Sequence, residues 1–402
     1  MLSLHTSPLA QPGEGDSGGM NVYVRELAAS LAQAGVPTSV YVRSWRDGLP
    51  PRVSVEPLFE VVHVPVGPYA LSKEQLPAIA DEFADWVSDD IRSRGEATVL
   101  HANYWLSAVA AHRLKHELEL PLVTTFHTLA EVKTASGDAE PGGRAEAERM
   151  VIGCSDAVCA SNSVEADQLV ELYGADSARI EIVPPGVDHA FFAPGDRRGA
   201  RWALGLGPDP VLLFVGRIQP LKGLDVAVGA LAAMRSRTAT LVAVGGPSGA
   251  EGQVELDRIQ RMIHDLGIEA RVRFVPPQPH HMLSTYYRAA DVCVVPSRSE
   301  SFGLVAAEAS ACGTPVVATA VGGLTTLVDD GVSGVLMPDR DPAAWAAVLD
   351  GLIEHPLRLA EMSAAAAERG RHYTWSTTAA RLRRVYSDLS VSRVPATCVG
   401  LP

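Results

Sequence analysis

Two glutamates have the spacing to hold the hydroxyl groups of a sugar. Glu300 and Glu308 stand eight positions apart in a stretch that follows an expected strand. On a helix this spacing is a little over two turns, so we expect both carboxylates to face broadly one way. Carboxylate oxygens accept hydrogen bonds from vicinal hydroxyls. The backbone amides of Phe302, Gly303 and Leu304 would open the helix and be free to donate. The alternative is a helix-start glutamate favoured by the dipole, together with a surface glutamate.

Two cations are suited to bind a diphosphate. Arg217 and Lys222 follow the first expected strand of the second half of the chain. They lie at its carboxyl end, where open parallel sheets bind ligands. An arginine offers a bidentate fork and a lysine a compact point charge, and the two together suit a diphosphate. The alternative is a pair of solvated loop charges.

A glycine-rich loop, residues 5–21, precedes the first expected helix. It contains four glycines and two prolines. Gly18 and Gly19 stand directly before the helix, whose free amides and positive dipole end favour a phosphate. The loop therefore predicts a phosphate-binding turn, and an ordinary glycine-rich loop is the alternative.

Strands and helices alternate in two series, which predicts an α/β protein with two doubly wound, Rossmann-like domains. The first series has expected strands at residues 1–4, 36–43, 52–66, 98–102, 122–126, 157–161 and 180–183. The second has expected strands at residues 211–215, 239–244, 272–275, 292–295, 316–318 and 335–337. We expect one domain at residues 1–193, joined by a last helix at 377–390, and a second domain at 194–376. Their facing sheet edges would form an interdomain cleft.

The composition excludes several classes of function. A formal charge of −13 over 402 residues argues against nucleic acid or an anionic membrane surface as a partner. We find neither a signal peptide nor a long apolar run, so we expect a cytoplasmic protein. The five cysteines show no metal-binding spacing, and we expect them to be reduced, buried thiols.

Glu300 and Glu308 form the E-x7-E pattern of retaining glycosyltransferases with the GT-B fold, and the whole chain resembles that family. The cations Arg217 and Lys222 match its diphosphate pair. Four N-terminal segments resemble the branch that moves N-acetylglucosamine from UDP-GlcNAc to 1D-myo-inositol 3-phosphate in mycothiol biosynthesis. These segments are residues 5–21, 67–77, 104–107 and 127–130. The resemblance also implies a homodimer, with no cofactor and no metal required.

The resemblance implies that the domain at residues 1–193 binds the acceptor and that the domain at 194–376 binds the nucleotide-sugar, with one set of residues for each substrate. The substrate-binding set is His5, Asn21, Lys73, Tyr104, Thr128 and Arg144. In it, two cations and two hydroxyls would hold the acceptor phosphate, and Asn21 would contact the inositol ring. On the donor side, Gly19 would approach the diphosphate opposite the two cations, and Glu308 would bind the ribose. Glu300 and the amides after it would hold the transferred sugar. His127 would lie near the C6 hydroxyl of that sugar.

We expect a front-face mechanism, because sugar hydroxyls would occupy Glu300 and the nearest other carboxylate, Asp16, is a weak candidate nucleophile in a loop. Arg217, Lys222 and the helix start would stabilise the leaving diphosphate, which takes the acceptor proton. Asp339 and Asp341 resemble a metal-binding D-x-D motif, but we expect helix capping. Two other functions remain open. One is a retaining transferase of this fold with another donor or acceptor, and the other is a non-catalytic sugar-nucleotide-binding protein.

Overall fold

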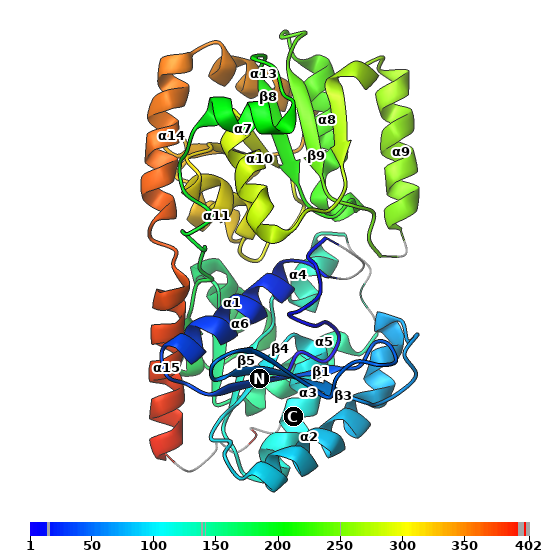
Figure 1. Ribbon diagram of the computed structural model, residues 1–402, viewed down its shortest axis with the longest axis vertical. Helices are drawn as coiled ribbons and strands as arrows, with labels where there is room; N and C mark the ends of the chain where they lie inside the picture. Colours follow the sequence, from blue (N-terminus) through cyan, green and yellow to red (C-terminus); the bar gives the residue numbers. More distant parts are fainter. Residues whose placement is uncertain (14–16, 138–139, 141, 250, 393–397, 399–402) are drawn as a thin grey trace. The chain divides into compact units, whose positions relative to one another are not determined.

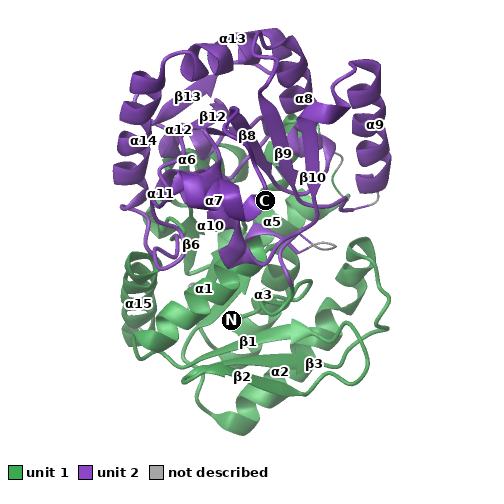
Figure 2. Cartoon of the chain, turned by 45° about the horizontal axis from the view of Figure 1, so that its top comes forward, with its two compact units in different colours: residues 1–10, 20–186, 375–402 green, residues 11–19, 187–374 purple. Residues whose placement is uncertain are grey.

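The computed structural model describes residues 1–13, 17–137, 140, 142–249, 251–392 and 398. The chain forms two compact units (Figure 2). Unit 1 contains Met1–Ala10, Met20–Gly186 and Trp375–Pro402, and unit 2 contains Gln11–Gly19 and Val187–Thr374. The division falls seven residues before the expected boundary at 193/194. The reason is that Val187 pairs with Thr374, and Phe192 is buried in a core of unit 2.

Unit 1 is a mainly parallel sheet covered by helices (Figure 1). Its strands run in the orders β1-β3-β2 and β4-β5-β6-β7, and among the described strands only β2 and β3 pair antiparallel. The strands are β1 Thr38–Arg43, β2 Arg52–Glu56, β3 Phe59–Val64, β4 Leu100–Asn103, β5 Leu122–Thr125, β6 Ala157–Ala160 and β7 Ile180–Ile182. The helices are α1 Gly19–Gln33, α2 Ala80–Arg94, α3 Trp105–Leu118, α4 Ala130–Ala135, α5 Arg144–Cys154, α6 Ser163–Tyr173 and α15 Trp375–Ser392.

Leu2 joins the two groups of strands in unit 1. It forms parallel bridges to Tyr41 of β1 and to Ala102 of β4. Its amide donates to the His101 carbonyl at 2.8 Å, and its own carbonyl accepts from the Asn103 amide at 3.0 Å. The strand expected over residues 1–4 is therefore reduced to a single residue that bridges β1 and β4.

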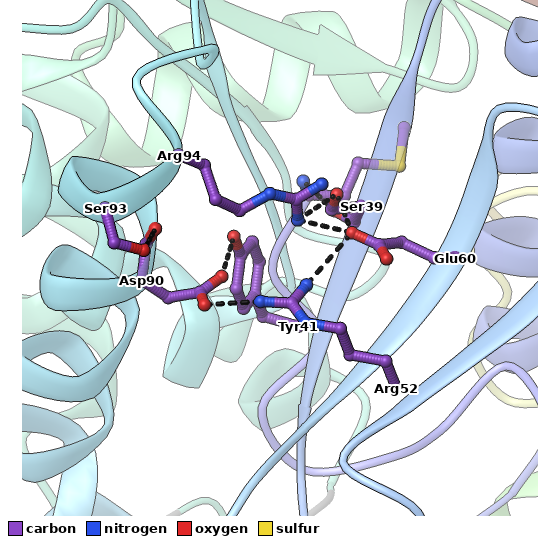
Figure 3. Close-up of polar contacts among 8 residues, drawn as sticks. Ser39, Tyr41, Arg52, Glu60, Asp90, Ser93 and Arg94 are labelled. Atoms are coloured by element: carbon purple, nitrogen blue, oxygen red, sulfur yellow. Dashed lines mark hydrogen bonds and ion pairs between the residues drawn. The ribbon is translucent and has the colours of Figure 1, made fainter.

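An ionic network ties α2 to this sheet (Figure 3). The carboxylate of Glu60 accepts from Ser39 at 2.7 Å and from Arg52 at 3.1 Å, and it also pairs with Arg94. Asp90 of α2 pairs with Arg52 and accepts from the Tyr41 hydroxyl at 2.9 Å. Burial alone would raise the pKa of Glu60, but these donors outweigh burial and hold its pKa below the usual value.

Unit 2 is an entirely parallel sheet in the order β10-β9-β8-β11-β12-β13, with helices on both faces (Figure 1). Its strands are β8 Val211–Val215, β9 Thr240–Val244, β10 Val272–Val275, β11 Val292–Val295, β12 Val316–Thr319 and β13 Gly334–Met337. All six expected strands are confirmed, with their ends within one residue. Its helices are α7 Arg197–Leu204, α8 Leu224–Ala233, α9 Gly252–Asp265, α10 Leu283–Ala289, α11 Leu304–Ala311, α12 Leu324–Leu327, α13 Pro342–Ile353 and α14 Pro356–Gly370.

The predicted fold class is confirmed, because both units are α/β with parallel sheets. In unit 2 the strand order reverses between β8 and β11, and ligands of doubly wound sheets bind beyond the carboxyl ends of the strands at such a point. None of the helices in the described ranges combines the length and hydrophobicity needed to cross a bilayer.

The expectation of five reduced thiols is wrong for two cysteines. Cys154 and Cys398 form a disulfide across 244 positions of sequence, a separation at which residue spacing predicts no contact. Cys159, Cys293 and Cys312 are free and buried, as expected.

Candidate functional site

The loops after β8 and β11 bring Lys222 and Glu300 together in unit 2. The Lys222 ammonium lies 2.7 Å from Oε2 of Glu300, and the Ser297 hydroxyl donates to the same oxygen at 3.3 Å. Both charged side chains remain partly exposed, at 24% and 19%. The predicted diphosphate cation and the predicted sugar-binding carboxylate are thus direct partners, and either can exchange its contact for a ligand.

Arg217 lies beside the glycine-rich loop within unit 2. A Cβ built on Gly18 would stand 3.5 Å from the Arg217 Nε atom. A Cβ on Gly19 would stand 3.2 Å from Leu304, the first residue of α11. Gly18 and Gly19, which both belong to unit 2, therefore lie close to the guanidinium and to the first residue of α11. Asp16 and Gly15 of the same loop lie outside the described residues.

Glu300 is not helical, so the expectation that helical spacing sets the direction of both glutamates is wrong. The helix begins at Leu304, and Gly303 before it has a φ of 103°. The Glu300 carbonyl accepts from the amide of Gly323 at 2.9 Å. Tertiary contact with residues 322–323, rather than helical geometry, therefore shapes the loop that carries Glu300.

Glu308 is buried within α11, and both of its oxygens already have partners. His280 Nε2 lies 2.6 Å from Oε1, and the Tyr287 hydroxyl donates to Oε2 at 2.9 Å. Burial, and then the charge of Glu308, raises the pKa of Tyr287 well above its ordinary value, so Tyr287 stays protonated and donates. Sequence reasoning missed His280, and no local spacing connects it to Glu308.

The four residues predicted to hold the acceptor phosphate lie together in unit 1, and we call them the Tyr104 cluster. The Lys73 ammonium stands 4.7 Å from the centroid of the Tyr104 ring, and the Arg144 guanidinium stands 4.9 Å from it. Arg144 also donates to the Thr128 carbonyl at 2.7 Å and to its hydroxyl at 3.1 Å. The His5 ring packs against Tyr104 at 4.5 Å between centroids. The cluster places cations and hydroxyls around one aromatic ring.

Arg144 is 1% exposed and is already paired with carboxylates. Its Nε donates to Glu148 at 2.8 Å, and its Nη1 pairs with Glu140. Sequence reasoning missed both acids, although Arg144 and Glu148 stand four residues apart on α5, a spacing at which helical side chains meet. Glu140 lies before the start of this helix. A phosphate bound to Arg144 would therefore add to, or replace, an existing ion pair. In the described part of the chain, Lys73 forms no ion pair and is only partly buried.

Asn21 is buried on α1 and binds the loop before it. Its amide donates to the Thr6 hydroxyl at 2.5 Å and to the Ser7 carbonyl at 2.6 Å. These contacts fix residues 5–7 against α1 and so help to place His5. The predicted contact between Asn21 and the inositol ring stays a prediction.

His127 follows β5 in a left-handed conformation with a φ of 63°. Its Nε2 lies 3.0 Å from Asn103 Oδ1, an acceptor, so Nε2 carries the proton. Burial lowers the pKa of His127 to about 3, so the ring is neutral at neutral pH. Tyr104, after β4, also has a positive φ, of 73°. Strained backbone of this kind often occurs at functional sites.

Asp341 caps α13 and accepts from the amides of Ala343 and Ala344, which confirms the capping expected for this motif.

Two family models match the chain, one on each half. Residues 17–191 match the model Glycosyltransferase Family 4, and residues 196–372 match the model Glycosyl transferases group 1. A D-inositol 3-phosphate glycosyltransferase of Catenulispora acidiphila is 45% identical over 100% of this chain and 98% of its own. Another, from Xylanimonas cellulosilytica, is 46% identical over 98% of this chain and 97% of its own. The chain belongs to the D-inositol 3-phosphate glycosyltransferase family. It is a glycosyltransferase of the GT-B fold.

Solved structures agree with the fold of this D-inositol 3-phosphate glycosyltransferase family member. The sucrose-phosphate synthase of Thermosynechococcus elongatus superposes with a TM-score of 0.92 at 30% identity, over 97% of this chain and 98% of that one. The Anabaena protein HepE, solved with UDP and glucose, superposes with a TM-score of 0.75 at 20% identity, over 96% and 99% of the two chains. The second likeness concerns the fold alone.

Proposed function

We propose that this glycosyltransferase moves N-acetylglucosamine from UDP-GlcNAc to 1D-myo-inositol 3-phosphate with retention of configuration, the first step of mycothiol biosynthesis. The observation that carries the proposal is the Tyr104 cluster. In a chain with a net charge of −13, Lys73 and Arg144 converge on one ring beside the hydroxyls of Tyr104 and Thr128. Such a local concentration of cations and hydroxyls suits a phosphorylated acceptor. The names of the relatives support the same acceptor.

The donor side of the proposal rests on the switch point of unit 2. Arg217 and Lys222 follow β8, and the loop with Glu300 follows β11. We propose that the two cations bind the diphosphate and that Glu300 and the amides at 302–304 hold the sugar. Glu308 would accept from the ribose in addition to its two present donors. No metal cofactor is invoked, because the two cations can supply the positive charge.

We propose a front-face mechanism for the transfer. Arg217, Lys222 and the amides at the start of α1 stabilise negative charge as the bond between the sugar and the diphosphate breaks. The leaving diphosphate oxygen then takes the proton from the attacking inositol hydroxyl. His127, neutral and oriented by Asn103, binds a hydroxyl of the sugar rather than acting as a cation.

Release of UDP from UDP-GlcNAc, measured with a panel of acceptors, tests the proposal. The panel contains 1D-myo-inositol 3-phosphate, unphosphorylated myo-inositol and hexose phosphates, and the anomeric configuration of the product is read by NMR. We expect release with inositol phosphate and an α-linked product. Release only with another acceptor would favour the transferase of different specificity. UDP binding without any release would favour a binding protein.

Two further parts of the proposal need separate measurements. We propose a homodimer, which sedimentation velocity would distinguish from a monomer. We also propose a cytoplasmic location, which fractionation of the producing cell would test.

A further inference from the structure

Four side chains with metal-binding atoms lie together in unit 1, outside the Tyr104 cluster. His112 and His116 come from α3, Cys154 is the last residue of α5, and Cys398 lies near the end of the chain. One ligand atom from each residue lies within 4.8 Å of all the others. In this structure the two sulfurs are joined in a disulfide. The proposed transfer reaction uses none of these four residues.

The two imidazoles are directed at the sulfurs. Nε2 of His116 lies 3.3 Å from the Cys154 sulfur and 3.2 Å from the Cys398 sulfur, and Nε2 of His112 lies 3.5 Å from the Cys398 sulfur. In a tetrahedral zinc site, bonds of about 2.0 Å to nitrogen and 2.3 Å to sulfur place such atoms about 3.5 Å apart. Histidines four residues apart share one helix face. The His-x3-His spacing therefore points to a metal site, which the spacing of the cysteines alone does not indicate.

Packing between α3 and α5 fixes the position of Cys154. Lys115, which lies between the two histidines on α3, is 1% exposed. Its ammonium donates to the Cys154 carbonyl at 2.5 Å and to Asp156 at 2.8 Å. Three of the four ligands therefore stand on two helices that are locked together by a buried contact that does not involve Cys398.

We propose that, in the reduced chain, His112, His116, Cys154 and Cys398 bind one Zn²⁺ ion. Two thiolates and two imidazoles complete a closed tetrahedral set, the kind found in structural zinc sites, and soft sulfur ligands favour zinc over magnesium or calcium. The ion links Cys398 to α3 and α5. The site lies at the far ends of these helices from Tyr104 and Arg144, about 15 Å along each helix at 1.5 Å per residue.

The disulfide and the zinc site exclude one another, because each needs the same two sulfurs. Reduction of the Cys154–Cys398 bond takes two electrons and two protons and gives two thiols. A dithiol reductant such as dithiothreitol supplies both and is itself oxidised to a disulfide. Zinc binding then releases the two thiol protons. Zinc is therefore retained where thiols are kept reduced and is lost on oxidation.

Metal titration of the full-length protein tests this proposal. The protein is reduced, the reductant is removed under argon, and Co²⁺ is added as a spectroscopic probe before displacement by Zn²⁺. We expect one Co²⁺ per chain, with the d–d bands of a tetrahedral site and thiolate-to-cobalt charge transfer, and one Zn²⁺ per chain by elemental analysis. Zinc should also protect two thiols from alkylation. A reduced wild-type chain that binds neither ion tightly would overturn the proposal.

Variants identify the ligands. His116 and Cys398 are exposed, so His116→Ala and Cys398→Ser should fold and should lose the cobalt spectrum. His264→Ala, at an exposed histidine of unit 2, and Cys312→Ala, at a buried free thiol of unit 2, are matched controls and should keep it. A cobalt spectrum unchanged in both His116→Ala and Cys398→Ser would show that the metal binds elsewhere and would contradict the assignment.

Discussion

Lys73 is the cation of the Tyr104 cluster without a carboxylate partner among the described residues. Its charge is therefore available to a phosphate without breaking an ion pair. A hydrogen bond to a charged group contributes about 1.5–3 kcal/mol, so Lys73→Met should raise the KM for inositol phosphate about tenfold or more, with a smaller change in kcat. Steady-state UDP release at varied acceptor concentration measures this change. Arg25→Met, at an exposed cation of α1, is the matched control. An unchanged acceptor KM in Lys73→Met would place the phosphate elsewhere.

Arg217 stands beside Gly18, and its guanidinium lies 3.5 Å from the Ser248 hydroxyl. We expect Arg217 to stabilise the negative charge that develops on the diphosphate in the transition state. Loss of one such preorganised donor typically costs about 10²–10³ in rate, so Arg217→Met should lower kcat by a factor in that range. Single-turnover transfer from UDP-GlcNAc provides the measurement, with Arg261→Met on the exposed face of α9 as control. A fall confined to donor affinity would argue that Arg217 binds the ground state only.

Gly303 has a conformation and surroundings that a side chain does not fit. Its φ is 103°, and a Cβ would stand 2.8 Å from a methyl group of Leu324. Gly303→Ala should therefore displace the loop that carries Glu300 and the amides before α11, and it should lower the affinity for UDP. The strain of a left-handed residue alone is about 1–2 kcal/mol.

Thermal stabilisation by UDP measures the effect of this change. Gly351→Ala is the matched control, because Gly351 lies within α13 and a Cβ there meets nothing within 4 Å. That change should leave UDP binding intact and stabilise the fold by about 0.5–1 kcal/mol. Equal UDP-induced shifts of the melting temperature in both variants would show that the loop after β11 is not part of the donor site.

The same region shows what residue patterns can and cannot predict. The strands of unit 2 were predictable because buried parallel strands are continuous apolar runs, as in residues 211–215. The conformation of Glu300 was not predictable, because it depends on residues 322–323, more than twenty positions away. By contrast, Glu148 could have been paired with Arg144 from helical spacing, because both stand on α5. His280 and Cys398 reach their partners only through the tertiary fold.

Two buried histidines link the stability of unit 1 to pH. His101 on β4 contacts the Tyr386 hydroxyl of α15 at 2.5 Å and the Thr125 hydroxyl at 2.8 Å. Burial, followed by the nearby N-terminal amine and His127, lowers the pKa of His101 to about 3, and burial lowers that of His127 to about 3. In the unfolded chain each pKa is about 6.5. Between these values the unfolded chain binds protons that the native state does not, so stability falls as the pH drops below about 6.5.

Each histidine should remove about 1.4 kcal/mol of unfolding free energy per pH unit below that point, or about 2 kcal/mol by pH 5. His101→Gln keeps a polar, neutral side chain and removes one of the two proton sites. Between pH 7.5 and 5, the unfolding free energy of the variant should thus fall by about 2 kcal/mol less than that of wild type. This holds even if the variant is less stable at pH 7.5. Native-state hydrogen exchange of the β4 and β5 amides reports the free energy of opening unit 1, independently of unit 2. The same pH dependence in wild type and His101→Gln would mean that His101 does not set the acid stability of this unit, and that other groups resist protonation in its native state.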